Sequence, residues 1–108
     1  PVPVPVPVSE GEDVTLKPDY KINEGDVIQW LFGDEKLLTH IAEIRGETRQ
    51  TLICDDDADG RFRDRLDLDE TTGSLTIKNT RTEHSGLYKL HIRTRIRTLQ
   101  QRFSVTVS

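Results

Sequence analysis

Cysteine is almost absent from this chain of 108 residues, which contains only Cys54. A single thiol cannot form a disulfide within the chain and cannot supply a thiolate-rich metal site. The fold must therefore be held by packing and hydrogen bonds, in a domain small enough that each core contact matters. We expect Cys54 to be a half-buried structural residue near a strand end; the alternatives are a reactive thiol and an interchain disulfide.

Long apolar runs are also missing. No run approaches the roughly 18 residues that a membrane span requires, and the chain does not open with a charged and then apolar leader. We therefore expect no direct membrane insertion by this segment, and any signal or anchoring segment would lie outside it. The formal net charge of −4 gives no reason to expect nucleic acid as a partner.

Catalytic and cofactor-binding motifs are missing as well. The three histidines, His40, His84 and His91, are scattered over separate predicted strands and loops. No Gly-x-Ser-x-Gly elbow, His-Glu-x-x-His pair, phosphate-binding glycine loop or paired cysteine motif occurs in the sequence. We therefore expect no enzymatic activity and no cofactor.

The chain does contain a series of short apolar-rich runs. Hydrophobic residues make up 33% and charged residues 31% of the sequence, a balance that favours strands with one solvated face. Several runs alternate with period two, which predicts strands at residues 14–16, 27–32, 37–44, 51–54, 61–68, 74–77, 87–92 and 103–107. Of these, only 37–44 could instead form a helix, and we assign it to a strand. Eight or nine short strands predict an all-β, two-sheet antiparallel sandwich.

The first eight residues alternate strictly between proline and valine. Every second residue therefore lacks a backbone donor and has a fixed φ, which excludes a central strand. The segment could bury its valines along a sheet edge, or it could be a spacer. We accordingly divide the chain into an N-terminal segment, residues 1–9, and a domain, residues 10–108.

An acidic turn precedes one predicted strand. Asp55, Asp57 and Asp59 have the spacing that opens a calcium loop of the EF-hand kind. Such a loop needs a glutamate at its twelfth position and flanking helices, whereas that position holds Leu66 and the flanks are predicted strands. We expect a solvated acidic turn, with weak cation binding as the alternative, and hence no metal site.

The order of these features resembles a variable-type immunoglobulin domain over residues 10–108. The resemblance rests on five segments, which are Gly-Glu-Asp-Val-Thr-Leu at 11–16, Ile-Gln-Trp at 28–30, Gly-Arg-Phe at 60–62, Gly-Ser-Leu-Thr-Ile at 73–77 and His-Ser-Gly-Leu-Tyr at 84–88. In that family these segments are the second strand, the third strand with its core tryptophan, the start of strand D, strand E and the tyrosine corner. The resemblance implies a core that includes Trp30, Leu75, Tyr88 and Leu90.

The sequence departs from that family at three places. The two cysteine positions of the inter-sheet disulfide fall at Pro18 and Leu90, so packing around Trp30 must replace a bridge worth about 4 kcal/mol. His84 stands where the family usually has an acidic residue that pairs with the arginine corresponding to Arg61. The final strand lacks the glycine bulge of antibody joining segments, so antibody-like pairing is not implied.

Disulfide-free first domains of this type occur in the signalling lymphocytic activation molecule (SLAM) group of adhesion receptors, and the wording of residues 73–90 looks especially like members from bony fishes. The resemblance implies a non-catalytic recognition or adhesion domain, extracellular, in a membrane-anchored receptor. It also implies that the partner is another immunoglobulin-like cell-surface domain or a second copy, so that a homodimer is one outcome. The alternative is a structural module of an intracellular or matrix repeat protein.

Side-chain parity then separates the core from a candidate binding surface on the sheet that carries the third, sixth and seventh strands. The candidate partner-binding residues are Gln29, Leu31, Ile41, Glu43, Lys89, His91, Arg93, Arg95 and Arg102. The arginine-rich stretch 93–97 falls at the hairpin between the last two strands. We expect a positive patch that meets an acidic protein surface, with an ordinary solvated hairpin as the alternative.

Overall fold

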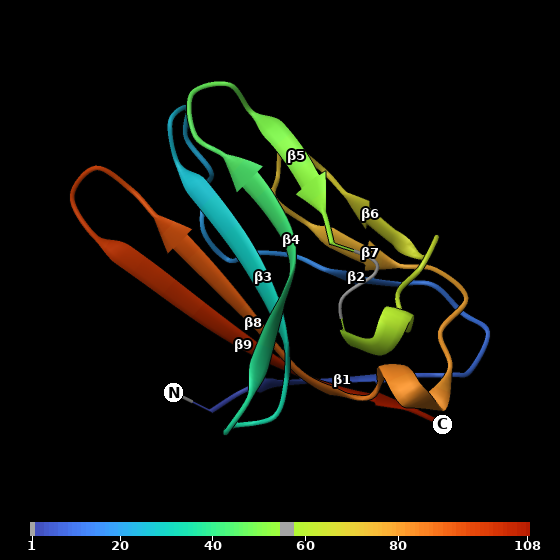
Figure 1. Ribbon diagram of the computed structural model, residues 1–108. Coiled ribbons are helices and arrows are strands. Elements are labelled where there is room, and N and C mark those ends of the chain that lie inside the picture. Colours follow the sequence, from blue (N-terminus) through green and yellow to red (C-terminus); the bar gives the residue numbers. More distant parts are fainter. Residues whose placement is uncertain (1, 55–57) are drawn as a thin grey trace.

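The computed structural model describes residues 2–54 and 58–108, and within these ranges nine strands form two facing sheets (Figure 1). The all-β, two-sheet prediction is confirmed. The strands are β1 (Val4–Val8), β2 (Val14–Leu16), β3 (Val27–Gly33), β4 (Leu38–Arg45), β5 (Gln50–Ile53), β6 (Leu66–Leu68), β7 (Leu75–Ile77), β8 (Gly86–Arg93) and β9 (Thr98–Val107). Two short 3-10 helices, η1 (Ala58–Gly60) and η2 (Thr82–His84), lie in the connections.

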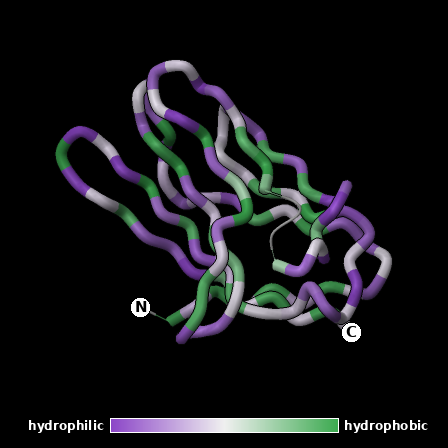
Figure 2. Tube along the Cα trace, in the orientation of Figure 1, coloured by the Kyte–Doolittle hydropathy of each residue, from purple (hydrophilic) through white to green (hydrophobic). Residues whose placement is uncertain are grey.

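The larger sheet has the strand order β1-β9-β8-β3-β4-β5, and the smaller sheet has the order β2-β7-β6. All pairings are antiparallel except that of β1 with β9, which is parallel. The proline and valine segment is thus the outermost strand beside the C-terminal strand (Figure 1). Along the strands, hydrophobic and hydrophilic residues alternate, as expected for a sheet with one solvated face (Figure 2).

The strand expected at residues 61–68 is shorter than the sequence pattern predicts. β6 begins only at Leu66, and residues 61–65 form turns. Asp64 has a φ of 60°, which interrupts an extended backbone. Phe62, expected in that strand, is instead a fully buried core residue supplied by the turn.

The core is centred on Trp30, which is fully buried, as are Leu75, Tyr88 and Leu90. The ring of Trp30 lies 5.7 Å from that of Phe103, centroid to centroid. Trp30 also pairs with Leu90 in the register of β3 and β8, so the second cysteine position is occupied by an aliphatic side chain against the tryptophan strand. Apolar packing therefore occupies the place of the disulfide.

A hydrogen bond fastens Trp30 to the opposite sheet. Its indole Nε1–H donates to the carbonyl of Gly73, 2.9 Å away, just before β7. Gly73 has a φ of +79°, and a Cβ there would lie 3.3 Å from a side-chain carbon of Ile22. A glycine is therefore needed at the position that accepts the tryptophan hydrogen bond.

The corner before β8 is held by His84, which is fully buried. The Tyr88 hydroxyl donates to the His84 carbonyl at 2.6 Å. The His84 ring accepts the Arg81 backbone N–H at Nδ1, 2.8 Å away, and its Nε2 lies 2.7 Å from the Arg61 carbonyl. Since Nδ1 accepts, Nε2 carries the proton, and the ring is neutral. Burial lowers the pKa of His84, in agreement with this neutral form.

The neutral imidazole thus bridges two backbone segments where the family usually places an ion pair. Its ring stacks on that of Phe62, with centroids 5.2 Å apart. The guanidinium of Arg61 lies over the Phe32 ring, 5.3 Å from its centroid, and donates to the Glu83 carbonyl at 3.3 Å. Arg61 therefore meets the backbone of Glu83 rather than a carboxylate at position 84.

Candidate functional site

The outward side chains of the larger sheet form a continuous surface, which we call the outer face. They alternate with buried residues such as Ile28, Trp30, Tyr88 and Leu90. The register aligns them in two rows, one of Gln100, His91, Gln29, Glu43 and Leu52, and one of Arg102, Lys89, Leu31 and His40. Eight of the nine residues predicted for partner binding lie on this face or on the adjoining β8–β9 hairpin.

The ninth, Ile41, was expected on the outer face and is fully buried, so that prediction is wrong. The register between β3 and β4 shifts between Trp30 and Leu31, which pair with Ala42 and His40. Ile41 is the extra residue of this bulge, and the inward and outward alternation changes there. His40 takes the outward place instead. The alternating pattern in the sequence carries no sign of the bulge, so it could not have identified His40.

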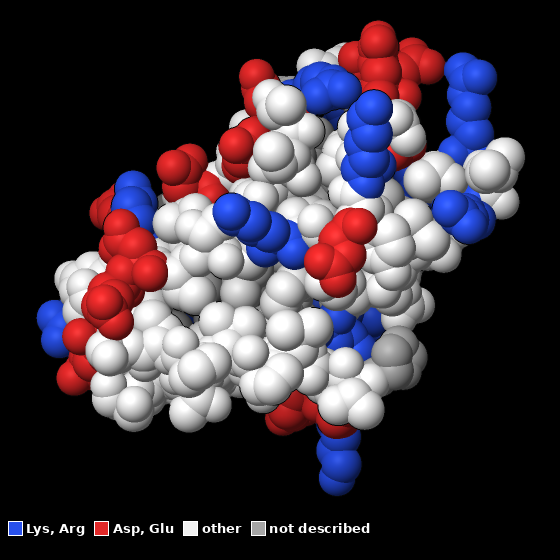
Figure 3. Space-filling view, turned by 180° about the vertical axis from the view of Figure 1, so that it is seen from behind, with Lys and Arg blue, Asp and Glu red and all other residues white. Residues whose placement is uncertain are grey.

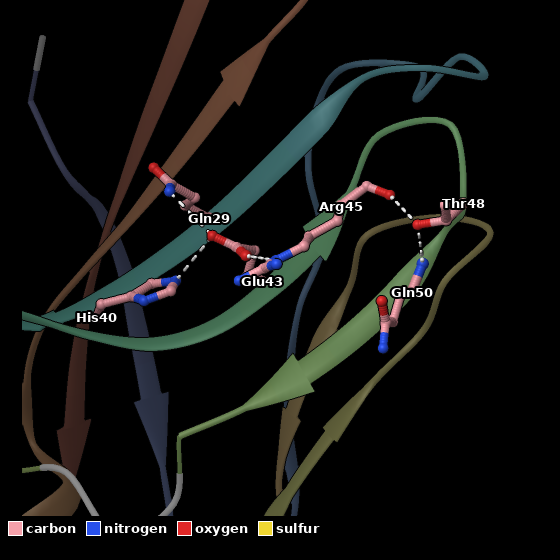
Figure 4. Close-up of polar contacts among 6 residues, drawn as sticks. All are labelled: Gln29, His40, Glu43, Arg45, Thr48 and Gln50. Carbon is pink, nitrogen blue, oxygen red and sulfur yellow. Dashed lines mark hydrogen bonds and ion pairs between the residues drawn. The ribbon is translucent and has the colours of Figure 1, made fainter.

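Glu43 is the centre of a polar network on the outer face (Figure 4). Its carboxylate accepts the Arg45 Nε–H at 2.7 Å and the Gln29 amide at 3.1 Å, and His40 Nε2 lies 3.6 Å away. The hydrogen bond from Arg45 lowers the pKa of Glu43, against an opposing effect of burial. Although Glu43 points outward, only 8% of it is exposed. It is an ionised group that is already satisfied within the domain.

The β8 and β9 half of the outer face is cationic. Lys89 is half-buried and Arg93 is exposed, whereas Arg102 forms an ion pair with Glu35 in the β3–β4 loop. His91, between Lys89 and Arg93, has a pKa lowered by burial and then by these two cations, so it is neutral near pH 7. The cationic character therefore comes from the lysine and arginines.

The β8–β9 hairpin projects beyond the two sheets (Figure 1). Its turn is closed by Thr94, whose hydroxyl donates to the Arg97 carbonyl at 2.9 Å. Arg95, Ile96 and Arg97 are exposed, and Ile96 is 87% accessible. Arg93 and Arg95 were predicted to bind the partner and Ile96 was not, although its position between two arginines at a turn is visible in the sequence.

Charge is unevenly divided between the larger sheet and the rest of the chain. The strands of this sheet carry four cations, Arg45, Lys89, Arg93 and Arg102, against the single carboxylate of Glu43. That is a net charge of +3 in a chain of net charge −4, so the remainder carries −7. Seen from behind, the molecule mixes both signs without a large patch of either (Figure 3).

Of the three aspartates considered for weak cation binding, Asp55 and Asp57 lie outside the described residues. Asp59 is exposed, has a φ of 62° and lies 3.6 Å from the Arg61 guanidinium. Within residues 2–54 and 58–108, no group of three or more His, Cys, Asp and Glu side chains is placed to hold a metal ion. In the same ranges, no helix has the length and apolar character that crossing a membrane requires.

The family model of the immunoglobulin V-set domain matches residues 2–108. The chain belongs to the immunoglobulin V-set domain family. In the vocabulary of V-set domains, β9, β8, β3, β4 and β5 are strands G, F, C, C′ and C″, and β2, β7 and β6 are strands B, E and D. The outer face is thus that of the GFCC′C″ sheet. The comparison of this chain with curated proteins found no match.

Solved structures share the fold of this V-set domain. Murine CRIg is 17% identical with a TM-score of 0.76, over 98% of this chain and 93% of that one. The CD2-binding domain of CD58, lymphocyte function-associated antigen 3, is 21% identical with a TM-score of 0.67, over 98% of this chain and 54% of that one. At these identities the likeness establishes the fold alone.

Proposed function

We propose that this V-set domain is a non-catalytic recognition domain of an immune-type receptor, and that it binds a protein through the outer face. The observation that carries the proposal is the cationic outer face on an otherwise acidic chain. Half-buried Leu31 lies between Lys89 and His40 in the register, which adds an apolar centre to a polar surface. This mixture suits an interface of moderate affinity. The CD58 domain, similar in fold, is named for binding the protein CD2.

The finer parts of the proposal rest on the resemblance in sequence. They are an extracellular position in a membrane-anchored receptor, and kinship with the SLAM group of bony fishes. A structural module of a repeat protein is the less supported alternative. It combines a spacer role for residues 1–8 with a missing disulfide that reflects a reducing compartment, and the first of these two points does not fit the structure. Residues Val4–Val8 instead form a strand of the larger sheet.

The charge of the outer face bears on the kind of partner. A two-fold dimer places the same patch on both subunits. Lys89 and Arg93 would then face cations of the second copy, whereas Glu43 is already neutralised by Arg45. Like charges opposed across an interface are unfavourable, and complementary charges favour association and selectivity. We therefore propose a partner with an acidic surface, of the immunoglobulin-like class, in preference to a second copy.

The test is charge reversal on the outer face. Lys89→Glu with Arg93→Glu reverses two cations and leaves Arg102 paired with Glu35. The domain, displayed on beads, is assayed against itself and a panel of immunoglobulin-like ectodomains, and we expect at least about a tenfold loss of binding to the partner identified. Lys17→Glu with Lys21→Glu is the matched control, because it makes the same charge change at exposed sites between β2 and β3. Equal binding by both double variants would refute the face assignment.

A further inference from the structure

The backbone of β1 has two unequal edges. One edge pairs with β9, since the Val8 carbonyl accepts the Ser108 N–H at 3.0 Å and the Glu10 N–H donates to the Ser108 carbonyl at 2.9 Å. Backbone groups of successive strand residues point to opposite edges. The even-numbered residues therefore direct their N–H and C=O groups toward β9, whereas Pro3, Pro5 and Pro7 direct theirs away from the sheet.

The free edge of β1 consequently has no hydrogen-bond donor along its length. Proline has no N–H, so Pro3, Pro5 and Pro7 present only carbonyls. The next outward N–H, that of Ser9, already donates to the Glu12 carboxylate at 3.3 Å. The same alternation places the side chains of Val6 and Val8 against the core. In the Pro-Val repeat, the prolines thus remove the outward N–H donors, and the valines at 6 and 8 hold the strand against the core.

We propose that β1 is an edge-blocking strand, which prevents another β-strand from extending the larger sheet beyond β1. A strand that docks beside β1 could donate to its carbonyls, but its own carbonyls would face an edge without donors. Buried, unsatisfied carbonyls make such an addition unfavourable. Association through the GFCC′C″ sheet is therefore directed to its outer face and away from its β1 edge.

The prolines carry this role without help from charge. Edge strands are often protected by charged side chains, especially lysine. β1, with the sequence VPVPV, has none. Val4 is 43% exposed and Val2 is 89% exposed, so apolar side chains are accessible at this edge. Without the prolines, this would be an uncharged edge strand with exposed apolar residues.

The decisive variant is Pro3→Thr with Pro5→Thr and Pro7→Thr in the full chain. It restores three outward N–H donors, and it introduces no additional apolar surface because threonine is more polar than proline. We expect the wild type to stay monomeric in sedimentation velocity. The variant should dimerise with an association constant at least about tenfold higher, since three donors become available to a second copy. Val2→Thr with Val4→Thr is the matched control, because it adds threonine without adding an outward donor.

A triple variant that stays as monomeric as the control would overturn the proposal. If the triple variant melts at a much lower temperature than the wild type, the single Pro5→Thr variant is tested in its place. An association constant of Pro5→Thr equal to that of the control variant would likewise overturn the proposal. Adding Lys89→Glu and Arg93→Glu to the triple variant distinguishes dimerisation through the β1 edge from dimerisation through the outer face. Dimerisation unchanged by these substitutions supports the edge, whereas dimerisation lost with them assigns the contact to the outer face and refutes the edge mechanism.

Discussion

Because His84 is a buried, neutral bridge, we predict that the free energy of unfolding of this domain depends on pH. The buried ring accepts from the Arg81 N–H and is held at the Arg61 carbonyl. Protonation would place a second N–H against the Arg81 N–H and bury a charge, so the native state resists it and the pKa of His84 is lowered. In the unfolded chain a histidine titrates near its ordinary pKa of about 6.5. Below that pH the unfolded state binds more protons than the native state.

Proton linkage gives the sign and the magnitude of the effect of pH on the free energy of unfolding. The free energy of unfolding contributed by His84 is fully present above about pH 6.5 and is lost as the pH falls below it, until the lowered pKa of the folded state is reached. One such group gives a slope of at most about 1.4 kcal/mol per pH unit. For a domain stable by about 5–15 kcal/mol, that slope is measurable.

The assay is urea unfolding between pH 5.5 and 7.5, followed by the fluorescence of the single, buried tryptophan. The window lies above the ordinary pKa of the carboxyl groups, so Glu43 and Asp69, whose pKa values are lowered, add little slope. Glutamine does not titrate, so His84→Gln should remove most of the dependence of the free energy of unfolding on pH. It should also lower the free energy of unfolding by about 1–3 kcal/mol, because one backbone group is left without its hydrogen-bond partner.

His91 is the necessary control, because its pKa is also lowered and it contributes a slope of the same sign. His91→Gln should therefore remove a smaller part of the slope, since His91 is only half-buried, and should leave stability at pH 7.5 nearly unchanged. A pH slope in His84→Gln equal to that of the wild type would show that His84 is not the neutral, buried bridge described above.

Two further substitutions test the centre and the outer face. Leu90→Ala should cost about 2–5 kcal/mol in urea unfolding, because it opens a cavity against Trp30 where other members of the family have a disulfide; a loss below about 1 kcal/mol would contradict this. Glu43→Gln should cost no more than about 1 kcal/mol at pH 7, since Arg45 is largely exposed. Its difference from the wild type should vanish as the pH falls through the lowered pKa of Glu43, and a pH-independent difference would contradict the role of the ion pair.

Short-range pattern in the sequence was sufficient for the architecture. The alternation around Trp30, Leu75 and Tyr88 predicts strands with one buried face, and these residues are fully buried. The same rule failed at Ile41, because a bulge changes the parity of a strand without changing its composition. It also failed at residues 61–65, which form turns before β6 begins; the left-handed φ at Asp64 is incompatible with the extended backbone that the apolar spacing predicts there.

Contacts between distant residues were beyond what the sequence could predict. The ion pair between Arg102 and Glu35 joins residues 67 positions apart, and it changes Arg102 from an available cation into a paired one. Likewise, His84 could be recognised as a departure from the family, but its partners are backbone groups of Arg61 and Arg81. Any residue supplies such groups, so side-chain identity gives no sign of them.

The missing disulfide and the histidine bridge together determine how the stability of the domain depends on redox conditions and on pH. A disulfide stabilises mainly by restricting the unfolded chain, and its effect does not depend on protonation. The hydrogen bonds of Trp30 to Gly73, of Tyr88 to the His84 carbonyl and of the Arg81 N–H to His84 Nδ1 act only in the native state. One of them requires a neutral imidazole, so the stability that replaces the disulfide is independent of redox conditions but falls as the pH drops below about 6.5. Reductant should therefore leave the melting temperature of this V-set domain unchanged, whereas mild acid should lower it.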